Sequence, residues 1–280
     1  MKQYSITLTP VGGLANRMKA IEAGIRLARK VGSELRILWF RTWEINCPFS
    51  LIFEPLLMDG VKLTEAGIKE ELTLDRPRRR NGYIPALFEH FAFQARIFEG
   101  EATRLRDQGF SFEQWARGRN VYLAACVDFL PQPEGQDFSL FRPIPLLTQR
   151  IKKNRQDLGQ DYIGVHIRRT DNIHSIQLSP TSLFVDRIAT QLVQNPHTKF
   201  FLATDDEKEK DTLTTHFGEH IVTPPDQADR DSIPGIQNAV VEMYTLAHAQ
   251  RIWGSAQSSY SETAAHINHI PIELLTRQHS

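Results

Sequence analysis

The sequence predicts an α/β fold built from two parallel sheets, each packed against helices. Three observations support this prediction. Short apolar, strand-like runs alternate with helical patterns, a glycine turn follows the first run, and a proline-rich stretch divides the chain near its middle. The chain has 280 residues, which suits two compact domains of about 100–200 residues each.

The charge and cysteine content limit the partners and the compartment. There are 33 Lys and Arg against 33 Asp and Glu, so the formal net charge is zero. A broad nucleic-acid or anionic-membrane surface is excluded, because it would need many Lys and Arg contacts to phosphate. Cys47 and Cys126 form no CxxC pair, and no apolar run approaches about 18 residues. With no signal-peptide pattern at the start, we expect a soluble cytoplasmic protein with no transmembrane segment.

The N-terminal segment predicts a strand, a glycine turn, a helix and a second strand. Apolar and polar residues alternate over 4–8, and the turn covers 12–17. Apolar residues then recur every three or four positions on one helical face, at Met18, Ile21, Ile25 and Ala28. Gly32 is expected to close this helix, and 35–40 forms the next apolar strand. This order predicts a parallel sheet with a helix packed on it.

The middle of the chain has a weaker pattern. It predicts helices over 49–58 and 84–97 and a buried strand over 121–127. Five proline and glycine residues then mark a linker between domains. The expected first domain, linker and second domain are 1–140, about 131–149 and 150–280.

The second half alternates strands and helices at the spacing of a doubly wound, Rossmann-like domain. The expected strands are 162–167, 199–204, 220–222 and 251–254. The expected helices lie around 184–192, from 206, over 238–249 and over 261–267. Two domains of this kind that face each other would form a cleft, which is a usual place for a ligand.

Polar clusters follow the predicted strands, and ligands of such sheets bind at the carboxyl ends of the strands. These clusters are 12–17, 168–171, 204–206 and 255–261. The forked guanidinium group of arginine suits a diphosphate, and Ser258 and Ser259 precede a helix whose free amides also favour phosphate. The clusters therefore indicate a nucleoside-diphosphate site. The alternative is that Arg168, Arg169 and Asp171 form a structural ion-pair network.

The same clusters resemble the motifs of the α-1,2/α-1,6/O-fucosyltransferase superfamily. Residues 12–17 resemble its Gly-Gly-x-x-Asn-Arg motif, and 164–171 resemble its His-x-Arg-Arg-x-Asp motif. Residues 201–206 and 258–261 are similar to its second and third motifs. The four motifs occur in the right order, and the sequence most resembles the α-1,6-fucosyltransferases of bacterial nodulation and of N-glycan core modification.

This resemblance implies a GT-B fold, with two Rossmann-like domains facing a cleft. The N-terminal domain would take the acceptor and the C-terminal domain the nucleotide sugar. The implied activity is inverting fucosyl transfer from GDP-fucose, or a related GDP-sugar, to a glycan hydroxyl. No metal or other cofactor is implied.

The resemblance also implies a role for each matching residue. Arg168 would bind the β-phosphate of GDP, with Arg169 supporting the same region and His166 lying against the nucleotide. The remaining donor-side residues are Asp205, Asp206, Ser258 and Ser259. Glu242 stands where relatives carry an Asp that binds guanine, and Asn16 stands where some relatives place an active-site Asn.

One departure concerns the general base. After Asp171 the α-1,6 relatives carry a Glu, whereas 172–177 contain no carboxylate. His174 or Asp171 could substitute. The alternatives to a fucosyltransferase are therefore a non-catalytic GDP-sugar-binding module and a transferase that uses another GDP-sugar.

Two further patterns have ordinary structural explanations. Asp229-Arg230-Asp231 has the form of a metal-binding DxD sequence, but a solvated turn is the expected structure. The aromatic residues Phe88, Phe91, Phe93 and Phe98 are expected to belong to the core rather than to a sugar-binding platform.

Overall fold

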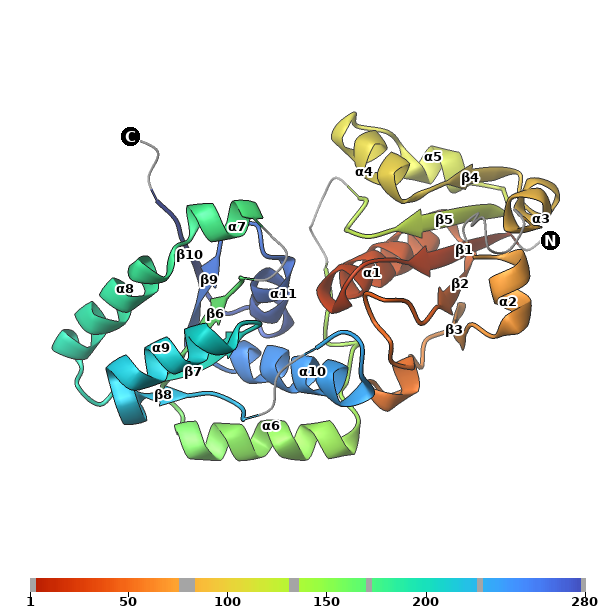
Figure 1. The fold of residues 1–280 in the computed structure, drawn as a ribbon. Coiled ribbons are helices and arrows are strands. Elements are labelled where there is room, and N and C mark those ends of the chain that lie inside the picture. Colours follow the sequence, from red (N-terminus) through yellow and green to blue (C-terminus); the bar gives the residue numbers. More distant parts are fainter. Residues whose placement is uncertain (1–3, 76–83, 131–135, 170–172, 226–228, 278–280) are drawn as a thin grey trace. The chain divides into compact units, whose positions relative to one another are not determined.

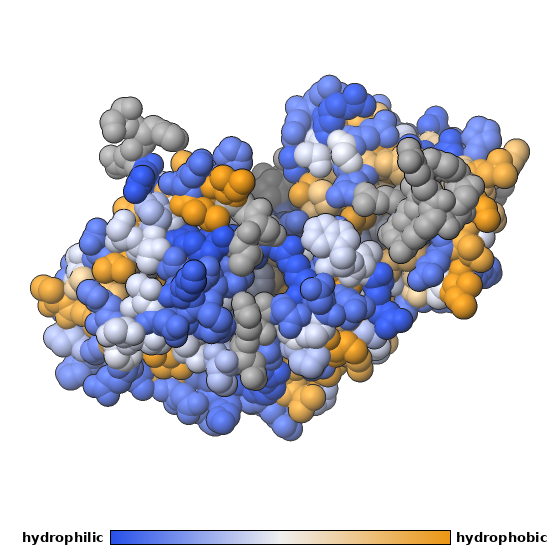
Figure 2. All heavy atoms as spheres, viewed as in Figure 1, coloured by the Kyte–Doolittle hydropathy of each residue, from blue (hydrophilic) through white to orange (hydrophobic). Residues whose placement is uncertain are grey.

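The computed structural model describes residues 4–75, 84–130, 136–169, 173–225 and 229–277. The chain divides into two units, Met1–Arg142 and Pro143–Ser280 (Figure 1). Within the described ranges, no helix is long and apolar enough to cross a membrane. Figure 2 shows hydrophobic residues scattered among hydrophilic ones on the face in view.

The first unit contains a five-stranded parallel sheet with β1 at its centre. The strands in spatial order are β3 (Val61–Glu65), β2 (Glu34–Trp39), β1 (Ser5–Pro10), β5 (Val121–Ala125) and β4 (Ala95–Ile97). Strands β1 and β5 are buried along their whole length, as expected for strands with a neighbour on each side. The strands expected near 4–8, 35–40 and 121–127 are therefore confirmed.

The helix predicted after the glycine turn is confirmed as α1 (Leu14–Val31), the first of the helices described in this unit. The others are α2 (Ile68–Thr73), α3 (Ile84–Ala92), α4 (Glu99–Asp107) and α5 (Phe112–Ala116). Gly32 ends α1 in the left-handed region, with φ 67°, and its amide donates to the Ala28 carbonyl. Glycine adopts this conformation without the steric cost that a Cβ would add.

The two predicted helices of the middle region differ from the structure. Instead of a helix over 49–58, only a short 3-10 turn forms, Phe49–Leu51. Pro55 lies within this range, and a proline in a helix interior removes a hydrogen bond and clashes with the preceding turn. The second helix ends at Ala92, and the chain continues into β4.

The four phenylalanines predicted to belong to the core separate into two pairs, one packed against the core and one exposed. Phe93 and Phe98 contact Tyr122 on β5, as expected for core residues. Phe88 and Phe91 are instead 42% and 80% exposed on α3. The expectation that all four belong to the core was therefore wrong for these two.

The second unit also contains a five-stranded parallel sheet, here with β6 at its centre. In spatial order the strands are β10 (Ile272–Leu275), β9 (Arg251–Ser255), β6 (Tyr162–Ile167), β7 (Lys199–Thr204) and β8 (Ile221–Val222). The chain adds β7 and β8 on one side of β6, then β9 and β10 on the other. This is the doubly wound order expected from the sequence, and its switch point lies between β6 and β9.

Six α-helices occur in the described part of the second unit. They are α6 (Pro145–Leu158), α7 (Ile173–Leu178), α8 (Thr181–Gln194), α9 (Glu207–Phe217), α10 (Ile233–Ala247) and α11 (Ser259–Ile267). Helix α11 approaches β9 closely at Gly254. A Cβ at this glycine would lie 2.7 Å from Ser261 Oγ and 3.1 Å from Ser261 Cβ. The absence of a side chain therefore sets the spacing between the strand and the helix.

Candidate functional site

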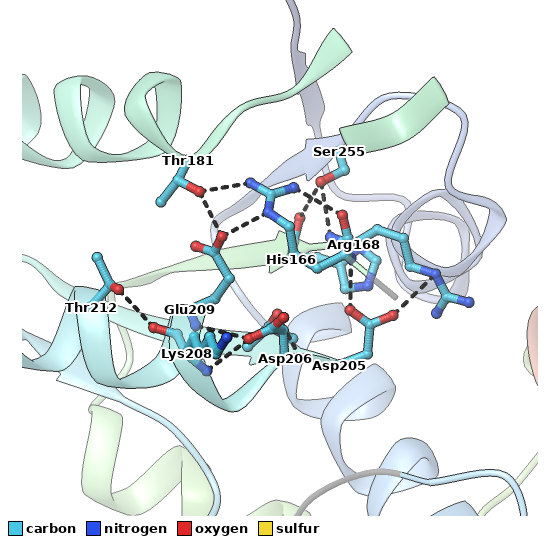
Figure 3. Close-up of polar contacts among 11 residues, drawn as sticks. His166, Arg168, Thr181, Asp205, Asp206, Lys208, Glu209, Thr212 and Ser255 are labelled. Carbon is cyan, nitrogen blue, oxygen red and sulfur yellow. Dashed lines mark hydrogen bonds and ion pairs between the residues drawn. The ribbon is translucent and has the colours of Figure 1, made fainter. Parts of the chain in front are cut away.

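The candidate site lies at the carboxyl ends of β9, β6 and β7, which are neighbours in the second sheet. Because the strands are parallel, the residues that end them meet at one edge. Ser255 ends β9, Arg168 follows β6, and Asp205 follows β7. Figure 3 shows these three residues in contact, so the structure brings together clusters that are far apart in the sequence.

Arg168 is held at its backbone and at its side chain. Its amide donates to Ser255 Oγ at 3.1 Å, and its Nε lies 3.3 Å from Asp205 Oδ2. The Arg168 side chain is 19% exposed, so the guanidinium group is oriented but still reaches solvent. A fixed guanidinium at a strand end can bind an anion without a large loss of side-chain entropy.

The guanidinium group of Arg169 forms hydrogen bonds with other groups of the protein. Its Nε donates to Glu209 at 2.8 Å, its Nη1 to the Arg168 carbonyl at 2.8 Å, and its Nη2 to Thr181 at 3.1 Å. Its side chain is only 8% exposed. This geometry makes Arg169 a brace for the segment that carries Arg168, in agreement with the supporting role implied by the resemblance.

Replacing Arg169 with leucine should therefore lower stability. The Glu209 carboxylate, 14% exposed, would lose its cation, and breaking a buried pair costs about 3–5 kcal/mol. The measurement is urea unfolding. Lys30→Leu is the matched control, since the Lys30–Glu113 ion pair has a similar length, 2.9 Å, but its two side chains are 50% and 40% exposed. An equal loss in the two variants would contradict the bracing role.

The two aspartates after β7 have different contacts. Asp205 accepts from the Arg169 amide at 2.8 Å and faces Arg168 Nε, so it positions both arginines. Asp206 is the N-cap of α9, and its side chain accepts from the Lys208 and Glu209 amides. Its carboxylate therefore stabilises the start of a helix, while Asp205 belongs to the polar edge itself.

His166 is a buried, neutral imidazole within this edge. Its ring stacks on Tyr260 at a centroid distance of 4.9 Å, and burial together with the positive charges of Arg168 and Arg169 lowers its pKa to about 3. Its Nδ1 has no hydrogen-bond partner among the described residues. A neutral ring of this kind can contact an uncharged heterocycle or donate one hydrogen bond to a ligand.

Tyr260 links His166 to a buried acid on α10. The Tyr260 hydroxyl donates to the Ala239 carbonyl, and Glu242 lies one turn further along the same helix. Glu242 is 4% exposed, and its Oε1 has no hydrogen-bond partner in the described part of the chain. Burial raises the pKa of Glu242 to about 8, although the Lys210 ammonium lowers it in part. An unpartnered buried carboxyl is costly and often marks a ligand contact.

The N-terminus of α11 offers a further anion-binding feature. Ser258 is its N-cap and is buried, yet its side chain makes no capping hydrogen bond. The first amides of the helix, from Ser259 on, therefore keep donor capacity that a phosphate could use. Ser258 and Ser259 lie beside Tyr260 in the sequence, so the amides and the aromatic ring belong to one segment.

The remaining predicted residues lie elsewhere. Asn16 belongs to the first unit, where it follows β1 on the first turn of α1 and is half-buried. Asp171 lies outside the described residues. Asp229 accepts from the Ser232 amide and hydroxyl at 2.8 Å, so it forms the turn before α10. No group of three or more potential metal ligands occurs among the residues that the structure describes.

Sequence reasoning missed Tyr260 as a site residue. The sequence shows Tyr260 as the aromatic residue of the Ser-Ser-Tyr-Ser motif. Its contacts with His166 on β6 and Ala239 on α10 depend on the tertiary fold. Lys210 was missed as well. It is a buried ammonium on α9 that donates to Glu207 at 2.9 Å and contributes to the field at Glu242.

Two parallel sheets of the Rossmann kind in one chain define the GT-B class of fold. Several solved structures that are similar to this chain are those of fucosyltransferases. The chain is similar to the fucosyltransferase NodZ from Bradyrhizobium, with 18% identity and a TM-score of 0.68 over 97% of this chain and 96% of that one. NodZ has been crystallised with GDP and soaked with GDP-fucose.

Two other fucosyltransferases have a similar fold. One is POFUT1, with 11% identity and a TM-score of 0.59 over 98% of each chain. The other is a variant of FUT1 from Arabidopsis thaliana bound to GDP, with 11% identity and a TM-score of 0.67 over 99% of this chain and 71% of that one. No family model and no curated protein matches the sequence. At these identities the similarity establishes the fold.

Proposed function

We propose that the protein is an inverting fucosyltransferase that uses GDP-fucose and a glycan acceptor. The observation that carries the proposal is a set of groups at and beside the carboxyl edge of the second sheet. It comprises the buried carboxyl of Glu242, whose Oε1 has no hydrogen-bond partner among the described residues, the neutral imidazole of His166 and the oriented guanidinium of Arg168. The fucosyltransferases of the same fold bind GDP, which supports this donor.

These groups match the chemical parts of GDP. The N1–H and N2–H donors of guanine would bind the Glu242 carboxylate, and His166 with Tyr260 would contact the nucleoside. The diphosphate would bind Arg168 and the free amides at the start of α11, near Ser258 and Ser259. Asp205 and Arg169 would hold Arg168 in place.

The transfer reaction would make one bond and break one. An acceptor hydroxyl oxygen attacks C1 of fucose from the side opposite the diphosphate, and the C1–O bond breaks with its electron pair passing to GDP. Arg168 would stabilise the charge that grows on the β-phosphate. The hydroxyl proton passes to a base, for which Asp171 and His174 are the predicted candidates, and Asn16 is the predicted acceptor-side residue.

The first experiment is a binding panel. Thermal shift and calorimetry with GDP, ADP, UDP and CDP should give a clear response to GDP alone. The release of GDP from GDP-fucose with a set of glycan acceptors then tests transfer. The absence of any response to guanine nucleotides would refute the proposal. GDP binding without turnover on any acceptor would instead support a non-catalytic binding module. Turnover with a different GDP-sugar, and not with GDP-fucose, would replace GDP-fucose as the proposed donor.

The raised pKa of Glu242 predicts that GDP affinity depends on pH. The carboxylate accepts from guanine, so binding requires Glu242 to lose its proton from a pKa of about 8. Affinity should therefore be about 25-fold weaker at pH 6.5 than at pH 8.5. Calorimetric titration of GDP across this range measures the slope. Glu242→Gln is the control, because the variant keeps the pH effects of GDP itself and lacks this titration.

A further inference from the structure

The first unit has a tight turn after β2 that is fixed by hydrogen bonds. Thr42 and Ile45 exchange two backbone hydrogen bonds, of 3.0 Å and 3.1 Å. Trp43 and Glu44 are therefore the two central residues of the turn. Because β1 and β2 are parallel neighbours, this turn lies at the same edge of the sheet as the glycine turn and Asn16, which follow β1.

Arg17 anchors this turn from inside the unit. Its guanidinium donates to the Phe40 carbonyl and to Thr42 Oγ1, each at 2.7 Å, and its Nε donates to the Gly12 carbonyl at 2.9 Å. Arg17 has no exposed surface and lies over the Trp39 ring at 4.6 Å. The loops after β1 and β2 are thus tied together by one buried cation.

The turn presents its aromatic ring to solvent. Trp43 is 71% exposed, whereas Trp39 and Trp253 are almost fully buried. A large aromatic ring on a fixed turn loses hydrophobic stabilisation when it faces water. Ligands of parallel sheets bind at the carboxyl ends of the strands, so exposure of Trp43 at that edge indicates a contact surface. Glu44 is half-buried beside it, and its Oε2 accepts from Thr42 Oγ1 at 2.6 Å. Its Oε1 makes no hydrogen bond within the described ranges.

An aromatic face next to a carboxylate suits one ligand class in particular. A pyranose ring with equatorial substituents has an apolar C–H face, which packs on the negative face of an indole ring. Its hydroxyl groups donate to carboxylate oxygens, and such charge-assisted bonds are strong. We propose that Trp43 and Glu44 form a carbohydrate-binding subsite, with one sugar ring stacked on Trp43 and one of its hydroxyls bonded to Glu44. This deepens the proposed function, on which it rests, by assigning the glycan acceptor to named residues.

The test compares glycan and GDP binding in the same variants. The probes are cellotetraose and chitotetraose, whose β-linked rings carry equatorial substituents, followed by an array of other glycans. Trp43→Ala should weaken glycan binding about tenfold or more, and Trp43→Phe should weaken it less, because a smaller ring keeps part of the stacking. Glu44→Ala should also weaken it. GDP affinity should remain that of the original protein in all three variants.

Phe91→Ala is the matched control, because Phe91 is an aromatic residue of similar exposure, 80% against 71% for Trp43, on helix α3. The subsite is overturned if Trp43→Ala binds the glycans as well as the original protein, if Phe91→Ala weakens them equally, or if no glycan binds while GDP does. A protein that binds glycans through Trp43 but binds no guanine nucleotide would refute the proposed donor and leave the subsite intact. The two failures are therefore distinguishable.

Discussion

Replacing Arg168 with alanine should lower kcat for fucosyl transfer by about 100- to 1,000-fold or more, close to complete loss of activity. In the transition state the bond from C1 to the β-phosphate is breaking, and negative charge accumulates on the departing diphosphate. Asp205 and Ser255 already hold Arg168 in position, so the guanidinium does not need to reorganise when this charge appears. The interaction is stronger in the transition state than in the ground state, and its loss should affect the rate more than binding.

The corresponding change in GDP affinity should be about tenfold. Steady-state kinetics with GDP-fucose and calorimetry with GDP measure the two effects on the same preparation. Arg168→Lys should be intermediate, because lysine keeps the charge but loses the fork that binds two oxygens. Arg104→Ala is the control, since Arg104 is 66% exposed in the first unit. Turnover by Arg168→Ala at the rate of the original protein would refute the role given to this residue.

The Glu242→Gln variant should bind GDP at least about 100-fold more weakly and yet be more stable when no ligand is present. The loss of affinity follows because the amide offers one acceptor and one donor where guanine needs two acceptors. The gain in stability follows from the raised pKa of Glu242, about 8 in the folded protein. Below its unfolded value of about 4.5 the carboxyl is neutral in both states, and stability falls as pH rises toward 8.

The glutamine variant avoids this ionisation. Its Tm should therefore exceed that of the original protein by at least about 2–4 °C at pH 8, with a smaller difference at pH 6. Thermal unfolding at the two pH values measures the difference, and comparison at equal pH cancels the contribution of all other groups. Equal or lower stability at pH 8 together with unchanged GDP affinity would remove Glu242 from the site.

Central strands could be predicted from the sequence, and so could the edge strand β8, expected at 220–222, whereas the edge strands β3, β4 and β10 could not. Buried strands such as β1, β6 and β7 are continuous or alternating apolar runs that few other structures explain. Strands β3 and β10 have only five and four residues and are partly exposed at the ends of their sheets, so they leave a weaker sequence pattern. Their conformation is set by the neighbouring strand, which no local pattern reveals.

Within the candidate site, the identity and the broad role of the residues were predictable, but their contacts were not. The resemblance gave Arg168 the phosphate and Arg169 a supporting role, without indicating what either residue contacts. Only the fold shows that Arg169 is bonded to Glu209 and Thr181 while Arg168 reaches solvent. Likewise, Asp206 caps a helix whereas its neighbour Asp205 faces the arginines. The contacts of Arg169 with Glu209 and with Asp205 join residues that are 40 and 36 positions apart.

The close approach of α11 to β9 has a consequence for recognising the proposed activity in distantly related sequences. A methyl group at Gly254 would meet Ser261 and push the helix outward, and the amides near Ser258 would move with it. No charged or polar group would have changed. A related sequence with a larger residue at this position would therefore retain all four motifs and yet lose the proposed diphosphate site. The presence of Gly254 is therefore as informative about the proposed diphosphate site as the presence of Arg168 and Arg169.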